Sequence, residues 1–201
     1  MTISKNQAVQ DWLRQHPQRF RTTSHYISYL TSALSFLVEL GNLKGNALFV
    51  GDKKEHALIF NKYVKGTPHS FLQCRWVPGL LTNSSQHMGT QQAHKTLAHI
   101  VKSRPSSPLR GRALKMFESR ETLYEHLNVQ IPDVVIFLGS ESQLLRIAQE
   151  CHKVNRPLIA CCPTRKYVNH VTYPILQSSS IRNVHFLTKI FVHALTKAQN
   201  S

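Results

Sequence analysis

The sequence predicts a three-layer α/β/α sandwich with a parallel sheet and an inserted helical hairpin. Short continuous apolar runs, typical of strands buried on both faces, alternate with amphipathic segments of helix length. Such alternation makes right-handed crossovers and a parallel sheet. A polar, proline-punctuated stretch at about 84–130 interrupts the alternation and forms the hairpin. We expect a single domain at 24–201 behind a basic N-terminal extension at 1–23.

A helix and a strand open the domain. Over residues 24–40, apolar side chains recur at three- and four-residue spacing, and Gly41 is the expected stop. The run 46–50 is short, apolar throughout and followed by Gly51. It predicts a strand with both faces buried.

The next helix is expected over roughly 52–65, with Asp52 as its cap and Gly66 at its end. Its expected core side consists of Ala57, Leu58, Ile59 and Phe60. A second strand follows at 69–74 and leads directly into the unusual turn RWVPGLLTN at 75–83.

The hairpin is expected to consist of helices at about 88–102 and 112–128. Residues 103–108 contain two prolines and three serines and cannot be helical throughout. Between residues 86 and 120 there are seven Lys or Arg and one acid. The sequence therefore predicts a hairpin with a basic tip.

Strand–helix alternation resumes after the hairpin. The expected elements are strands at 133–138 and 157–162, a helix ending near 154, a brief edge strand at 172–173, and a final helix at 178–198. The loop that contains Ser140 lacks the GxSxG pattern of a nucleophile elbow. We therefore expect Ser140 to be the N-cap of the helix that ends near 154 and not a nucleophile.

The charge balance points to a polyanionic partner. Lys and Arg number 25 against 10 Asp and Glu, a net charge of +15, and nucleic acid is the usual partner of such a chain. A membrane is not expected, because the longest apolar stretch, 27–40, is shorter than the ~20 residues that a spanning helix needs. The basic first 25 residues fit a mitochondrial presequence or a plain extension equally well.

The four cysteines are expected to be free thiols in a reducing compartment, and no metal is predicted. They lie at Cys74, Cys151, Cys161 and Cys162 and form no CxxC pair. The nearest approach to a zinc ligand set, His87, His94 and His99, matches no known spacing.

The loops after the expected strands carry no catalytic motif. Residues 51–54, GDKK, match neither GxGxxG nor the P-loop, and carboxylates for general acid–base chemistry are scarce. We therefore expect no enzyme activity, no cofactor and no small-molecule substrate.

Several motifs, in order along the chain, resemble the small-subunit ribosomal protein two family in its bacterial type. Residues 49–53, FVGDK, are similar to an FVGTK-like strand end, and 75–83 to an RWLGGMLTN-like turn. In the second half, 132–135, 155–159 and 180–182 resemble the family's PD strand, its G-I-P-V strand entry and its A-I-R helix opening. The resemblance covers roughly residues 24–198.

The resemblance implies a flavodoxin-like sandwich and a structural, rRNA-binding role on the small ribosomal subunit, among other ribosomal proteins. Departures from the family pattern include the missing GVHFGH-like N-terminal motif, the short hairpin, Pro78 where the family tends to have glycine, Pro163-Thr164 for an Asp, and Ser178–Ser180 for acids. They indicate a divergent organellar lineage. We expect a mitochondrial matrix protein more than a plastid one.

The expected RNA contacts are phosphate-binding cations and a few neutral donors. They are Lys53, Lys54, Arg75, Thr82, Asn83, Lys102, Arg104, Arg110, Arg112, Lys115, Arg165, Lys166 and Arg182. Any single lysine among them can equally be a solvated surface charge. Trp76 is expected to pack beneath the turn, with base stacking as the alternative.

Two other functions remain open. A free-standing RNA-binding or anion-binding protein would use the same basic surface without a ribosome. A small-molecule hydrolase or transferase would need a ligand at the strand ends, where α/β proteins place their sites.

Overall fold

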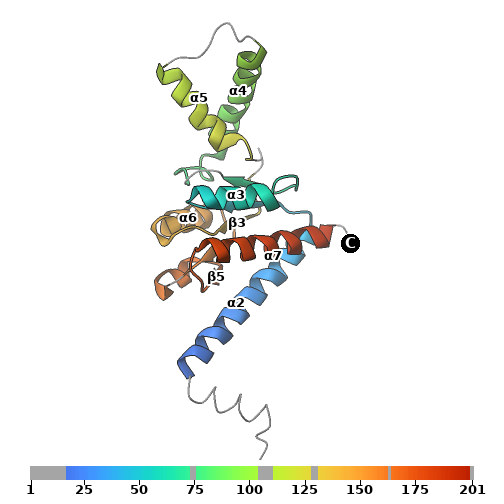
Figure 1. The fold of residues 1–201 in the computed structure, drawn as a ribbon, viewed down its shortest axis with the longest axis vertical. Helices are drawn as coiled ribbons and strands as arrows, with labels where there is room; N and C mark the ends of the chain where they lie inside the picture. The colour runs from blue at the N-terminus through green and yellow to red at the C-terminus, as the bar shows by residue number, and fades with distance from the viewer. Residues whose placement is uncertain (1–16, 73–75, 104–110, 128–130, 163, 200–201) are drawn as a thin grey trace, which may run out of the picture.

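A computed structural model describes residues 17–72, 76–103, 111–127, 131–162 and 164–199 (Figure 1). Its centre is a five-stranded, all-parallel sheet with the strand order β2-β1-β3-β4-β5. The strands are β1 (Ala47–Val50), β2 (Ser70–Leu72), β3 (Val134–Phe137), β4 (Leu158–Cys161) and β5 (Tyr173–Ile175). This is the flavodoxin-like order, and it confirms the predicted sandwich.

Helices cover both faces of the sheet (Figure 1). The bounds are α2 (Pro17–Asn42), α3 (Lys54–Tyr63), α4 (Ser84–Ser103), α5 (Gly111–Tyr124), α6 (Glu141–Lys153), the 3₁₀ helix η1 (Arg165–His170) and α7 (Ile181–Gln199). Helices α2, α3 and α7 pack on one face. Helix α6 packs on the other, together with η1 and the turn after β2.

Alternate strand residues fill the two cores. Phe49, Phe71 and Ile136 face α2, α3 and α7, whereas Val50 and Phe137 face α6. Residues of β1, β2, β3 and β4 are fully buried along their whole length, so the apolar runs are indeed strands covered on both sides.

The cysteines that the structure describes are free thiols, as predicted. Cys151, Cys161 and Cys162 are buried and free, and burial raises the pKa of each thiol to about 12. Cys74 lies outside the described residues.

Several element ends differ from expectation. Helix α2 begins at Pro17 and passes Gly41, because the left-handed residue that turns the chain is Lys44, at φ 56°. Helix α3 ends at Tyr63, with Gly66 (φ 87°) in the following turn. Leu58 is 70% exposed, so its expected place on the core side was wrong; Ile59 and Phe60 fill that side.

The hairpin α4–α5 projects from the β2 edge of the sheet, and the N-terminal end of α2 reaches out on the opposite side (Figure 1). At its base the hairpin is joined to β2 and closed on itself. The His126 ring stacks on Phe71 at 4.4 Å while its carbonyl accepts from the Phe71 N–H, and the Gln91 amide donates to the Leu127 carbonyl at 2.7 Å. Farther out, His94 packs against Phe117.

His69, just before β2, predicts a loss of stability in acid. The ring is 6% exposed and its Nδ1 accepts from the Ala47 N–H at 3.4 Å, which requires the neutral form. Burial lowers its pKa from 6.5 to about 4. Between pH 6.5 and pH 4 the unfolded chain binds a proton at His69 that the folded chain does not. The contribution of neutral His69 to stability is therefore complete above pH 6.5 and is lost as the pH falls towards 4.

We expect this histidine to contribute about 3 kcal/mol to the difference in unfolding free energy between pH 7.5 and pH 4. His69→Asn keeps an acceptor near the Nδ1 position but does not titrate. Urea titrations at both pH values should therefore give a markedly smaller difference for His69→Asn. An equal pH dependence in the two proteins would contradict the assignment.

Candidate nucleic-acid interface

The carboxyl ends of the parallel strands gather exposed cations at one edge of the sheet. Lys53 and Lys54 begin α3 after β1, Lys166 lies in η1 after β4, and Arg182 opens α7 after β5. All four are exposed. We call this group of four the carboxyl edge. Exposed cations beside two helix N-termini suit phosphate groups.

The turn after β2 has the form of a type II β-turn. The Leu80 N–H donates to the Val77 carbonyl at 3.1 Å, Pro78 is its second residue, and Gly79 is its third, at φ 85°. Proline is favoured at the second position of such a turn, and glycine is needed at the third. Pro78, the departure from the family pattern, is therefore compatible with the turn and stiffens it.

A buried carboxylate from another part of the chain holds this turn. Glu150 of α6 is 8% exposed, and its oxygens accept from the Trp76 indole N–H at 3.0 Å and from the backbone N–H groups of Gly79 and Leu81 at 2.9 and 3.3 Å. The Gln143 side chain accepts from the Trp76 backbone N–H. Sequence patterns missed Glu150, because an acid in an amphipathic helix ordinarily faces water.

Thr82 and Asn83 follow the turn at the base of the hairpin. Both are exposed, as a role in binding requires. However, the turn runs along α6 away from the carboxyl edge, and the Asn83 carbonyl accepts from the N–H groups of Gln86 and His87 at the start of α4. The two residues therefore belong to the hairpin base and not to the carboxyl edge.

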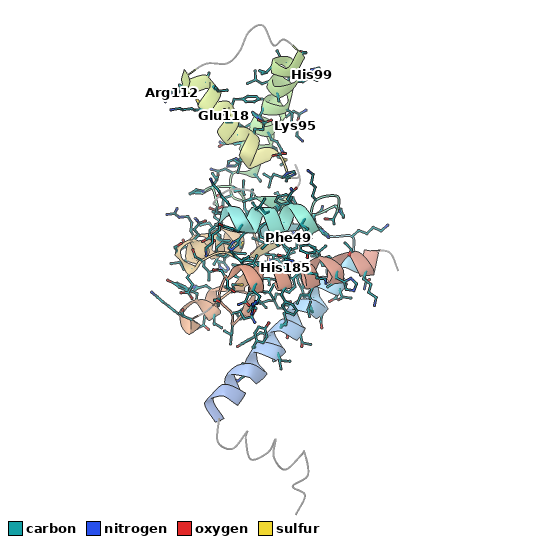
Figure 2. The ribbon with its side chains drawn as sticks, viewed as in Figure 1. Phe49, Lys95, His99, Arg112, Glu118 and His185 are labelled. Carbon is teal, nitrogen blue, oxygen red and sulfur yellow. The ribbon has the colours of Figure 1, made fainter. Side chains whose placement is uncertain are left out.

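The hairpin carries a second group of cations. Arg112 and Lys115 are exposed on α5, and Lys95 is exposed on α4. Figure 2 shows Arg112 on one arm of the hairpin and Lys95 and His99 on the other. Lys95 was not among the predicted contacts. Arg104 and Arg110 lie outside the described residues, as does Arg75 before the turn; Lys102 and Arg165 lie in helices, but their side chains are not described.

Comparison with known proteins decides the family. The family model described as Ribosomal protein S2 matches residues 22–198. The chain belongs to the ribosomal protein S2 family. The predicted resemblance is thereby confirmed, as is the expectation of a structural protein that is not an enzyme.

Relatives of this S2-family chain are distant. It is 27% identical over 165 residues to small ribosomal subunit protein uS2 of Francisella tularensis (77% of this chain, 67% of the relative). It is 27% identical to uS2 of Thermobifida fusca (85% and 61%) and 25% identical to uS2c of Emiliania huxleyi (86% and 78%). The chain thus spans about two thirds of the length of the first two relatives.

One solved structure, a phosphoheptose isomerase from Francisella tularensis, aligns over 98% of this chain and 99% of that one. The identity is 14% and the TM-score 0.43, a likeness that carries no conclusion.

In the S2-family chain, its own side chains fill the crevice between the ends of β1 and β3. Asp52 accepts from the Ser140 N–H at 3.0 Å, and the fully buried His56 ring lies 3.4 Å from Asp52. A Cβ on Gly51 would come within 2.5 Å of the Cβ of His56, so no side chain fits there. In doubly wound proteins this topological switch point is where ligands bind.

At this crevice one cap prediction is wrong and one is confirmed. Lys53, not Asp52, is the N-cap residue of α3, because the Asp52 carboxylate points across the sheet to Ser140. Ser140 does occupy the N-cap position of α6, but its hydroxyl bonds that of Ser142 instead of a backbone N–H.

The electrostatics of the crevice favour a charged Asp52 and a neutral His56. Burial alone would raise the pKa of Asp52, but the hydrogen bonds from Ser140 and the nearby His56 and Lys53 outweigh it, so the pKa lies below its ordinary value. Burial lowers the pKa of His56, and the neighbouring Asp52 only partly offsets this.

Among the described residues, no group of three His, Cys, Asp or Glu side chains is arranged to hold a metal ion. None of the described helices is long and apolar enough to cross a membrane.

Proposed function

We propose that this chain is a structural constituent of the small subunit of the mitochondrial ribosome, where it binds rRNA and neighbouring ribosomal proteins. The observation that carries the proposal is the family match over residues 22–198, nearly the whole chain. The relatives' names, small ribosomal subunit protein, and the net charge of +15 support it.

RNA would be bound mainly through phosphates. The carboxyl edge offers four exposed cations, and the hairpin offers a separate group that includes Arg112 and Lys115. Two separated basic groups suit a protein that bridges two segments of one folded RNA, since each group neutralises its own stretch of backbone. Arg75, Arg104 and Arg110 remain predicted contacts from the sequence alone.

The mitochondrial assignment rests on divergence. Identity to bacterial relatives is at most 27% among those named above, and the first 23 residues carry Lys5, Arg14, Arg19 and Arg21 against one acid, Asp11. A basic segment with few acids is typical of a mitochondrial targeting sequence.

Sedimentation of salt-washed mitochondrial lysate tests the proposal. The protein should travel with the small subunit through a sucrose gradient at high salt. Recovery only in the free soluble fraction would overturn the ribosomal role. Enrichment with plastid small subunits would preserve that role and overturn the mitochondrial one.

Salt dependence of RNA binding tests the carboxyl edge. For the double variant Lys53→Gln/Lys54→Gln, we expect the slope of log Kobs against log salt to fall by about 2, because each phosphate contact contributes about one unit. Binding of the full chain to a small-subunit rRNA fragment, measured by filter retention at several salt concentrations, gives the slope.

Lys153→Gln is the matched control. Lys153 is also exposed, but it ends α6 at the opposite edge of the sheet, so its loss should leave the slope unchanged. Equal slopes for the double variant and the wild type would remove Lys53 and Lys54 from the interface.

A further inference from the structure

Helix α7 is strongly basic and has an exposed aromatic ring. It contains Arg182, Lys189, Lys197 and two histidines, and no Asp or Glu. Phe186 is 49% exposed. A single exposed apolar side chain is ordinary in a soluble protein. Whether Phe186 belongs to a binding site therefore depends on the side chains beside it on the helix surface.

The helix presents three different faces. Val184, Leu187 and Phe191 are fully buried against the sheet. His185 faces α3, where its Nε2 lies 2.7 Å from the Tyr63 hydroxyl (Figure 2). These two contacts fix the rotation of α7, and they leave one face to solvent.

That solvent face is a stripe of Arg182, Phe186, Lys189 and His193, all exposed, which we call the α7 stripe. The spacings of four, three and four residues place these side chains in a row about 17 Å long. Cations four residues before and three residues after Phe186 flank its ring. An aromatic ring between cations is the arrangement by which proteins hold unpaired nucleotides.

The α7 stripe begins at the carboxyl edge. Arg182 belongs to both, and the backbone of Ser179, just before α7, lies against His56 in the first turn of α3. The start of α7 therefore lies beside the start of α3, where Lys53 and Lys54 are exposed. An RNA strand bound at the carboxyl edge can continue along α7, which contains no Asp or Glu.

We propose that the α7 stripe binds an unpaired segment of rRNA, with one base stacked on Phe186 and phosphates held by Arg182 and Lys189. This inference rests on the proposed ribosomal function and adds a site of base stacking to it. An acidic protein segment could also cover such a stripe. Continuity with the carboxyl edge and the flanked ring favour RNA.

Two substitutions of Phe186 separate stacking from charge. Phe186→Leu keeps an apolar side chain but removes the ring, and it should weaken binding of the full chain to a single-stranded 12-nucleotide RNA about tenfold. Phe186→Tyr keeps the ring and should bind within about twofold of wild type. Leu145→Ala removes an exposed apolar side chain from α6 and serves as the control.

Crosslinking in the intact particle completes the test. Irradiating purified small subunits at short ultraviolet wavelength should leave a nucleotide adduct on the peptide that contains Phe186, detected by mass spectrometry. Unchanged affinity of Phe186→Leu, or a photoreactive residue at 186 that captures protein instead of rRNA, would overturn the α7 site. If the wild-type chain fails to sediment with the subunit at all, the proposed function fails instead.

Discussion

Replacing Glu150 with alanine is expected to lower the free energy of unfolding by about 4 kcal/mol, a large part of the stability of an ordinary domain. The carboxylate accepts three hydrogen bonds from the 76–81 turn, and its loss leaves buried N–H groups of Trp76 and Leu81 without these bonds. Urea unfolding followed by tryptophan fluorescence measures the loss.

Glu150→Gln and Glu39→Ala are the controls. The glutamine keeps one acceptor oxygen, so about half of the loss should return. Glu39 is exposed on α2, and its removal should change stability by less than about 0.5 kcal/mol. A Glu150→Ala protein as stable as the Glu39→Ala protein would show that the turn is held by packing alone.

The Glu150 substitution also reports on binding. Because the turn leads into the hairpin base, its release should disorder Thr82 and Asn83 before the hairpin itself unfolds. We therefore expect weaker binding of rRNA fragments that contact the hairpin, at temperatures where the sheet is still folded.

Gly51→Ala is expected to destabilise the protein by about 3 kcal/mol through overpacking. The added Cβ would lie 2.5 Å from the Cβ of His56 and 2.9 Å from its Nδ1. The first of these atoms is fixed to the backbone of α3, so the contact is relieved only by moving the helix away from the strand. Chemical denaturation of the purified variant measures the cost.

Gly89→Ala is the matched control, with the opposite sign. None of the described residues comes within 4 Å of a Cβ at Gly89 in α4, and alanine is the better helix former by about 1 kcal/mol. This variant should be slightly more stable than wild type. If the two alanine variants unfold at the same urea concentration, the close packing of β1 on α3 is wrong.

Periodicity and composition predict the layers well. The runs 46–50, 133–138 and 157–162 are apolar without alternation, and each contains a strand with every residue buried. Proline and glycine predicted the break between the hairpin helices and the turn at 78–79. These signals are local, so a single sequence suffices to find them.

Helix ends and cap roles were less predictable. Gly41 was expected to stop α2, yet the chain turns at Lys44. Asp52 was expected to cap α3, yet it binds Ser140, which is 88 residues away in the sequence. Both outcomes depend on partners that become neighbours only when the sheet forms.

By itself, the sequence determined the class of fold, the family and the basic character of the surface. Buried strands and turns are recognised from short stretches of chain, and the net charge follows from the composition. The tertiary structure alone decided where that charge is presented. It divides the predicted contacts between the carboxyl edge and the hairpin, and it places Glu150 beneath the turn at 76–81 and Phe186 among cations on α7. The physical reason is that parallel pairing and helix rotation set these distances, and both are fixed by contacts between residues far apart in the chain.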